Sequence, residues 1–239
     1  TQSHFGDAAA TGLNLQPAAD YGHNTQMRNC RMDPKPQPGW RVDWTLDDHY
    51  KILPAGSQVR MRYTDLTSDA QAGLVEGWIV AGGYDSSGEV WIPRVLVRRQ
   101  AEAGRPLEST FVSVIEPYAT RPIATSIRRL ALQSVSGATL ADSNVAVLVA
   151  LADGRRDVIV ARDPEDKAAA GLLLQPDFSI RTDADLVLLR LKPDGAVESA
   201  ALCHGSRMVY KSLEIKVPEG ADSAEWPPAA APQPKEKSR

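Results

Sequence analysis

The chain has 239 residues, of which 43% are hydrophobic, so it can bury a substantial core in one large domain or two small ones. Its 27 basic and 30 acidic residues nearly cancel, which excludes a general electrostatic attraction to nucleic acid or to anionic membranes. No apolar run is long enough to cross a bilayer as a helix, and no secretory leader is recognisable near Thr1.

The two ends of the sequence differ from its middle. The first 40 residues are polar, and three prolines alternate with other residues between Asp33 and Gly39. Because such a run suits neither a helix nor a sheet interior, we expect residues 1–40 to form an irregular segment. Residues 218–239 are rich in Pro, Ala and charge, and we expect them to form a disordered tail.

The middle of the chain shows the patterns of β-strands, either alternating apolar and polar residues or short β-branched runs. The expected strands include residues 58–63, 74–80, 90–97, 110–115, 123–132, 145–151, 157–160, 186–191, 196–202 and 208–217. Asp-Gly pairs at 153–154 and 194–195 indicate hairpins, because glycine accepts the positive φ of a tight turn. Helical periodicity is nearly absent, apart from a turn or two at 164–174. The sequence therefore predicts an all-β fold, an antiparallel β-sandwich of about ten or more strands over residues 41–217.

The cysteines and carboxylates give weak signals for metal or disulfide chemistry. Cys30 and Cys203 are the only cysteines, and they fit either two buried free thiols or a single bridge in an oxidising compartment. Residues 43–50 hold three carboxylates and a histidine, but the spacing fits no EF-hand loop, and a strand would split these side chains between two faces. We therefore expect a polar surface there, no cofactor and no metal site, with a structural divalent cation as the open alternative.

Several stretches resemble the C-terminal β-sandwich of heparinase II/III-like polysaccharide lyases. The closest match is residues 109–118, STFVSVIEPY, which precedes a strand with a basic outer face ending near Leu130. Shorter matches to the family's tryptophan-bearing strands and hairpins occur at residues 60–67, 76–79, 90–93 and 153–157. The family joins an α-helical toroid to a β-sandwich, and its active site lies in the cleft between them.

The resemblance implies β-elimination on uronic-acid-containing polysaccharides such as glycosaminoglycans. This reaction needs a base for the C5 proton, an acid for the leaving oxygen and a group that neutralises the carboxylate. Tyr21 and His23 resemble the family's aromatic-and-histidine loop and are the candidate catalytic residues, with Asn24 as a candidate substrate ligand. The alternative for these three residues is a polar loop with satisfied hydrogen bonds.

The chain also departs from the family, because it lacks both the His-x-His-x-Asp motif and the helical toroid. We therefore expect a piece of a larger protein, inactive alone, that serves as cleft wall and scaffold beside an upstream α-helical domain of the same protein. It would be an enzyme only when joined to that domain. The resemblance also implies a secreted or periplasmic location. An anionic polysaccharide is the expected partner, and neither nucleic acid nor a membrane is expected.

Arginines and tryptophans supply the remaining candidates for polysaccharide binding. Four arginines are expected to bind substrate if neighbouring strands bring them together: Arg94, Arg98, Arg128 and Arg129. Ordinary charged residues on a solvated sheet face are the alternative. Four tryptophans could stack on sugar rings if exposed, although such residues are more often core: Trp40, Trp44, Trp78 and Trp91. The alternative function is a stand-alone carbohydrate-binding or structural β-sandwich without catalysis.

Overall fold

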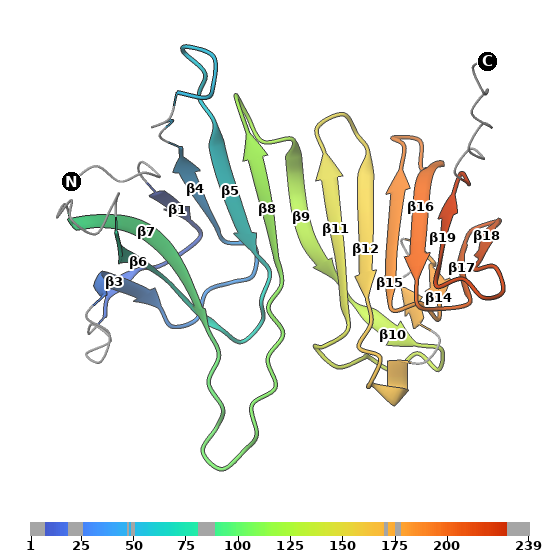
Figure 1. Cartoon of the computed structure of the whole chain (residues 1–239). Helices are drawn as coiled ribbons and strands as arrows, with labels where there is room; N and C mark the ends of the chain where they lie inside the picture. The colour runs from blue at the N-terminus through green and yellow to red at the C-terminus, as the bar shows by residue number, and fades with distance from the viewer. Residues whose placement is uncertain are drawn as a thin grey trace, which may run out of the picture. The chain divides into compact units, whose positions relative to one another are not determined.

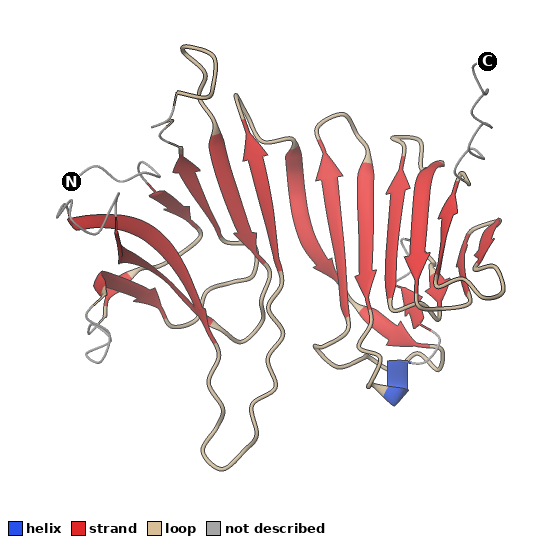
Figure 2. Ribbon diagram, viewed as in Figure 1, coloured by secondary structure: helices blue, strands red, loops and turns tan. Residues whose placement is uncertain are grey.

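The computed structural model is almost entirely β and its paired strands are antiparallel, which confirms the predicted fold class (Figures 1 and 2). Its single helical element in the described part of the chain is the 3-10 turn Lys167–Ala169. The chain divides into two compact units, Thr1–Arg128 and Arg129–Arg239. The structure describes residues 8–18, 26–46, 48, 51–80, 89–169, 172–174 and 178–228.

The N-terminal unit is built from two four-stranded sheets. The first, the β4–β5 sheet, contains in spatial order β1 (Ala8–Thr11), β4 (Arg41–Thr45), β5 (Arg60–Asp65) and β8 (Ser113–Tyr118). The second, the β6–β7 sheet, contains β2 (Gln16–Pro17), β3 (Met27–Asp33), β6 (Gln71–Val80) and β7 (Glu89–Arg98). Alternate residues of β4 and β6 form the core of this unit, and its buried members are Trp40, Val42, Trp44, Ala72 and Leu74. The intervening residues of β4 and β5 lie on the opposite face of this sheet.

Two strands at the edges of these sheets contain a proline. Pro93 lies opposite Glu76 in β7, and Pro117 lies opposite Met61 in β8. Proline has no N–H to donate to a further strand, so it is tolerated in a sheet mainly at the edge. Both positions agree with β7 and β8 being edge strands.

A buried carboxylate organises the end of β5. Asp65 is 1% exposed and accepts hydrogen bonds from the Tyr63 hydroxyl at 2.5 Å and from the Thr67 N–H at 2.9 Å. The Thr67 hydroxyl lies 3.3 Å from the same carboxylate and also accepts the Val112 N–H at 3.1 Å. Burial, together with the bond to Asp65, raises the pKa of Tyr63 well above its ordinary value. Asp65 thus connects β5 to the segment that enters β8.

The C-terminal unit contains the larger hydrophobic core, formed around central strands with both neighbours paired. A six-stranded sheet has the order β19 (Ser223–Trp226), β16 (Val197–Cys203), β15 (Leu186–Leu191), β12 (Arg156–Ala161), β11 (Val145–Leu151) and β9 (Ala124–Leu130), of which β9 spans the boundary between the units. A five-stranded sheet has the order β10 (Leu132–Ser134), β13 (Leu172–Leu174), β14 (Arg181–Thr182), β17 (Arg207–Tyr210) and β18 (Leu213–Lys216). Both predicted Asp-Gly hairpins are confirmed, with Gly154 (φ 87°) between β11 and β12 and Gly195 (φ 82°) between β15 and β16.

The structure differs from the sequence expectations in three places. Residues 1–40, expected to be irregular, contain β1, β2 and β3, and the expected tail 218–239 contains β19. The expected helical turns at 164–174 reduce to the 3-10 turn and the short strand β13. The expected single sandwich over 41–217 corresponds to parts of two compact units. The pairing partners of β1 and β19 are the separate strands β4 and β16, so local composition does not reveal these two strands.

Candidate functional site

The candidate catalytic residues Tyr21, His23 and Asn24 lie outside the described residues. The structure does fix the point where their segment joins β3. The carbonyl oxygen of Gln26 accepts the N–H of Trp78, at 2.8 Å, immediately before β3 begins. The surroundings of this junction are therefore the natural place to look for a binding site.

A group of aromatic and charged side chains lies beside that junction, and we call it the Trp–Arg cluster: Arg28, Asn29, Glu76, Trp78 and Trp91. The strand register places Arg28 opposite Glu76 and Trp78 opposite Trp91. The Arg28 guanidinium carbon lies 4.1 Å from the centre of the Trp91 ring, and its Nε donates to Glu76 Oε2 at 2.7 Å. Asn29 Nδ2 donates to the same oxygen at 3.0 Å.

A β-bulge brings Asn29 into the Trp–Arg cluster. The pairing of β3 with β6 shifts between Arg28 and Arg31, so that β3 carries one extra residue there. Asn29 has a φ of 51°, in the left-handed region that asparagine tolerates better than most residues. Without this bulge, strict alternation would turn Arg28 and Asn29 to opposite faces of the sheet. The bulge lets both side chains reach the Glu76 carboxylate.

The chemistry of the Trp–Arg cluster suits a saccharide. Trp78 and Trp91 are half-buried, and about 40% of the Arg28 side chain and 38% of the Glu76 side chain stay exposed. Half-exposed indole rings offer a flat surface to a sugar ring, and a carboxylate accepts sugar hydroxyls. Arg28 donates to Glu76 through its Nε. The terminal N–H groups of a guanidinium can pair with a carboxylate.

The four arginines expected to bind substrate occupy separate positions. Arg94 is exposed and lies across Gly77, where an ideal Cβ would be 2.2 Å from the Arg94 Nε. Arg98 is exposed on the same face of β7, about 13 Å further along the strand. Arg128 is exposed on β9, and Arg129 pairs with Asp142 at 2.7 Å. The strand order does not make β7 and β9 neighbours, so sheet pairing does not unite the four arginines.

The acidic stretch 43–50 contributes a hydrogen-bonded network on the outer face of the β4–β5 sheet. Arg62 donates to both oxygens of Asp43, at 2.8 and 3.2 Å, and the Tyr118 hydroxyl donates to Asp43 Oδ1 at 2.8 Å. Burial alone would raise the pKa of Asp43, but the hydrogen bonds from Arg62 and Tyr118 outweigh it and hold the pKa below its ordinary value. Asp48 accepts the N–H groups of Ile52 and Leu53. Asp47 and His49 lie outside the described residues.

Asp43 provides a test of this network by pH. Because its folded-state pKa is depressed, its contribution to stability is present above the unfolded pKa of 3.8 and is lost as the pH falls through the folded value. We expect Asp43→Asn to lower the free energy of unfolding by about 1–2 kcal/mol at neutral pH. The difference from the wild type should shrink below about pH 4, as urea denaturation over a pH series would show. A constant difference across the series would contradict this role.

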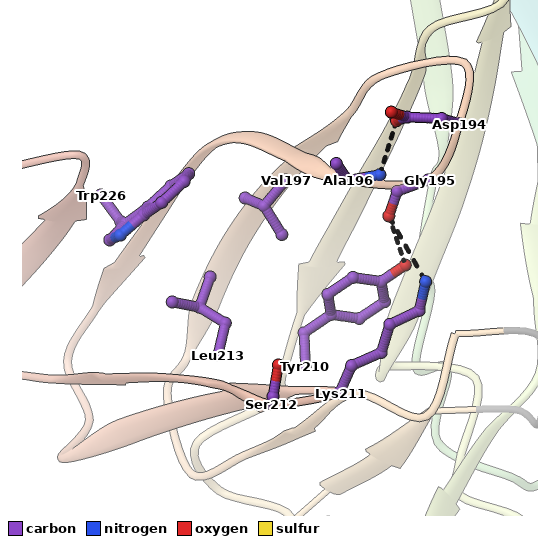
Figure 3. Close-up of a pocket in the computed structure, with 9 residues that line it drawn as sticks. All are labelled: Asp194, Gly195, Ala196, Val197, Tyr210, Lys211, Ser212, Leu213 and Trp226. Carbon is purple, nitrogen blue, oxygen red and sulfur yellow. Dashed lines mark hydrogen bonds between the residues drawn. The ribbon is translucent and has the colours of Figure 1, made fainter.

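The C-terminal unit contains a pocket of about 420 Å³ beside the second hairpin (Figure 3). Trp226, Val197 and Leu213 form one side of it, and they also pack against the core. On the other side, the Tyr210 hydroxyl and Lys211 Nζ point toward the Gly195 carbonyl oxygen, at 3.3 and 3.4 Å (Figure 3). Its volume lies within the range of small-ligand sites, and an indole on one side with a lysine on the other can hold a polar ring between them.

The cysteines and metal candidates give no second site. Cys30 and Cys203 are unbridged, the first buried and the second half-buried. Among the described residues, no group of three or more histidine, cysteine or acidic side chains could hold a metal ion. In that same part of the chain, no helix has the length and apolar character needed to span a membrane.

Sequence reasoning identified Trp78 and Trp91 as candidates for sugar stacking but did not identify Arg28, Asn29 or Glu76. Trp40 and Trp44 are 2% and 6% exposed, so they belong to the core, as tryptophans of a sandwich usually do. Arg28 and Glu76 are 48 residues apart and meet only through strand register. An asparagine next to an arginine in an otherwise alternating strand was the one local sign of the bulge.

No known protein-family model matches this chain, and no curated protein is detectably similar to it in sequence.

Proposed function

We propose that the chain is the β-sandwich part of a heparinase II/III-like polysaccharide lyase and binds a uronic-acid-containing polysaccharide at the Trp–Arg cluster. The observation that supports this proposal is the position of the cluster. It lies where the segment carrying Tyr21, His23 and Asn24 joins β3, through the Gln26–Trp78 hydrogen bond. Candidate groups for stacking and for carboxylate pairing thus lie close in the strand register to Gln26, the residue that precedes β3.

The division of roles follows from the chemistry of elimination. A sugar ring stacks on the exposed part of Trp91, the terminal N–H groups of Arg28 pair with the uronate carboxylate, and Glu76 accepts a ring hydroxyl. Pairing the carboxylate makes the C5 proton more acidic. His23 or Tyr21 then removes that proton, the electron pair forms the C4=C5 double bond, and the O4 leaving group takes a proton from the other residue. An upstream α-helical domain supplies the opposite wall of the cleft.

Trp91→Ala tests the binding half of this proposal. The substitution removes the stacking surface and the ring that holds Arg28, so the Kd for a uronic-acid oligosaccharide should rise about tenfold. Isothermal titration calorimetry with heparan sulfate and alginate oligosaccharides would measure this change. Trp226→Ala is the matched control, because it removes an indole of similar exposure from the other unit. An unchanged Kd for Trp91→Ala would contradict the assignment of the cluster.

His23→Ala tests the catalytic half. In the protein that carries both this chain and the proposed α-helical domain, the variant should bind oligosaccharide normally and form unsaturated uronate ends at least a hundredfold more slowly. The ultraviolet absorbance of the unsaturated ends measures the rate. If His23→Ala cleaved the polysaccharide at the wild-type rate, His23 would not be a catalytic residue.

A second candidate function is a stand-alone carbohydrate-binding module without catalysis. The pocket beside Trp226 favours it, because this pocket combines an indole wall with Lys211 and lies entirely within the C-terminal unit. Under this alternative, Trp226→Ala rather than Trp91→Ala weakens glycan binding, and no unsaturated product forms. The same pair of variants therefore separates the two functions.

A further inference from the structure

Two cationic side chains cover the glycine of the second hairpin, and we call the three residues the Gly195 site: Arg156, Gly195 and Lys211. We propose that this site binds the phosphate group of a small phosphomonoester, whose organic part lies in the adjacent pocket against Trp226. An ideal Cβ on Gly195 would be 3.4 Å from Arg156 Nη2 and 3.6 Å from Lys211 Nζ, so both cations converge on one point. Gly195 and Lys211 also line the pocket of about 420 Å³ beside this hairpin (Figure 3).

Aromatic rings position both cations. The guanidinium carbon of Arg156 lies 5.9 Å from the centre of the Phe178 ring, which belongs to a residue that is 4% exposed. Lys211 Nζ lies 5.1 Å from the centre of the Tyr210 ring and donates to the Gly195 carbonyl oxygen at 3.4 Å. The face of an aromatic ring attracts a cation but does not neutralise it. Both groups are therefore held near Gly195 with their charge intact.

Neither cation forms an ion pair with a carboxylate in the part of the chain that the structure describes. The neighbouring Arg155, by contrast, pairs with Asp153 at 2.7 Å. The acid of the second hairpin, Asp194, accepts the Ala196 N–H at 2.9 Å (Figure 3). Arg156 is half-buried, and a charge that folding removes partly from water is costly unless an opposite charge compensates it. The Gly195 site is therefore suited to an anion from solution.

The backbone at Lys211 does not favour a lysine. Tyr210 pairs with Leu213, so β17 and β18 are joined by a turn of two residues, and the first of them, Lys211, has a φ of 53°. Glycine, asparagine and aspartate dominate such positions, because other side chains are strained at positive φ. A lysine that occupies this position against the local preference suggests a use for its charge.

Two unpaired cations that converge on one point select a dianion. A phosphomonoester carries a charge of about −1.5 to −2 at pH 7, whereas a carboxylate or a sulfate monoester carries a single charge. Phosphate oxygens accept bidentate hydrogen bonds from a guanidinium and also bind a lysine ammonium. The nitrogens of Arg156 and Lys211 are at most about 7 Å apart, and each charged hydrogen bond spans about 2.8 Å. Different oxygens of one phosphate can therefore reach both cations.

The pocket next to the Gly195 site can hold the organic part of the ligand. Trp226, Val197 and Leu213 form its apolar side, and Lys211 lies on the other side (Figure 3). A flat ring can pack against the indole while its phosphate points toward Lys211. This ligand differs from the polysaccharide of both proposed functions, and its binding depends on no residue of the Trp–Arg cluster.

Lys211→Gly and Arg156→Met test the two cations. Glycine accepts the positive φ of the turn, so Lys211→Gly should keep the fold and lose only the charge. The probe is phenyl phosphate, followed by the amide chemical shifts of residues 194–197 and 211–213 in an NMR titration. We expect saturable binding to the wild type and at least tenfold weaker binding to either variant. Lys216→Gln, which alters an exposed lysine of β18, is the matched control and should bind phenyl phosphate as the wild type does.

Trp226→Ala separates the two parts of the ligand. This variant should bind inorganic phosphate as tightly as the wild type does, but phenyl phosphate more weakly. Unchanged binding of phenyl phosphate to Trp226→Ala would overturn the placement of the ring against the indole.

Three further results would overturn the phosphate site itself. These are the absence of saturable shifts with phenyl phosphate, unchanged binding in Lys211→Gly, or binding of phenyl sulfate as tightly as phenyl phosphate. Trp91→Ala should bind phenyl phosphate normally whether or not the Trp–Arg cluster binds a polysaccharide. The phosphate site and the proposed lyase function can therefore fail independently.

Discussion

Replacing Asp65 with alanine is expected to lower the free energy of unfolding of the N-terminal unit by about 3–5 kcal/mol. The Asp65 side chain is buried, with 1% of the residue exposed. Its carboxylate accepts hydrogen bonds from the Tyr63 hydroxyl, the Thr67 N–H and the Thr67 hydroxyl. Alanine leaves these donors buried without their acceptor, and each such loss costs about 1–3 kcal/mol. Urea denaturation followed by tryptophan fluorescence measures the effect, and buried Trp40, whose ring lies 5.5 Å from that of Tyr63, contributes to the signal.

Asp65→Asn is the matched control for this prediction. Asparagine retains one oxygen for the Thr67 N–H but turns an amide donor toward the Tyr63 hydroxyl, so it should cost less than alanine. A loss below about 1 kcal/mol for Asp65→Ala would show that water replaces the carboxylate at no great cost. In that case the connection between β5 and the entry to β8 would not depend on Asp65.

The hydrogen bond between Tyr63 and Asp65 also predicts that the free energy of unfolding depends on pH in the alkaline range. The folded-state pKa of Tyr63 is raised, so its contribution to stability is complete below the unfolded pKa of 10.0 and is lost as the pH rises toward the folded value. Above about pH 10, the unfolded chain releases the phenol proton while the folded chain keeps it, and the free energy of unfolding falls. The free energy of unfolding of Tyr63→Phe should fall less steeply than that of the wild type over this range. Equal slopes would contradict the assignment of the raised pKa to Tyr63.

Replacing Leu189 with alanine is expected to destabilise the C-terminal unit by about 2–5 kcal/mol. Leu189 is fully buried in β15, between Val158 of β12 and Ala200 of β16 in the strand register. Both neighbouring strands are fixed by hydrogen bonds, so the sheet cannot collapse into the space that the smaller side chain leaves. The cost therefore includes a cavity as well as the lost burial of methyl groups.

Leu188 provides the control, because it precedes Leu189 on the same strand and points to the opposite face, where it is 39% exposed. Leu188→Ala should change the free energy of unfolding by less than about 1 kcal/mol. Urea denaturation of both variants measures the two changes. If Leu188→Ala and Leu189→Ala lowered the free energy of unfolding by similar amounts, the face of β15 that carries Leu188 would also have to be packed against other residues.

The fold was predictable where its signals are local. Apolar runs at 145–151 and 186–191 correspond to β11 and β15, and the Asp-Gly pairs correspond to their hairpins, because a tight turn needs a residue that accepts positive φ. The strands β1 and β2 were not predicted, since they are short and exist only through pairing with distant partners. The division near Arg128 was also not predicted, because β9 runs through it without a change in composition.

The candidate binding residues were predictable only in part. Trp78 and Trp91 are recognisable by residue type, since few side chains stack well on sugars. Arg28, Glu76 and Arg156 are common residues whose neighbours come from distant parts of the sequence, so nothing beside them in the sequence distinguishes them from a solvated face. The convergence of Arg156 and Lys211 on Gly195 is a property of the folded chain alone.

The prolines of the edge strands have a consequence for how copies of this protein meet. Ile115 in β8 is 61% exposed, so this edge combines an apolar side chain with a strand that ends its sheet. Such an edge would ordinarily recruit a strand from another molecule and begin a growing intermolecular sheet. Pro117, two residues further on, removes the N–H that the incoming strand would need, and Pro93 does the same on β7. Each of these two edges thus has one N–H fewer to donate to a strand of another molecule, which makes intermolecular pairing there less favourable.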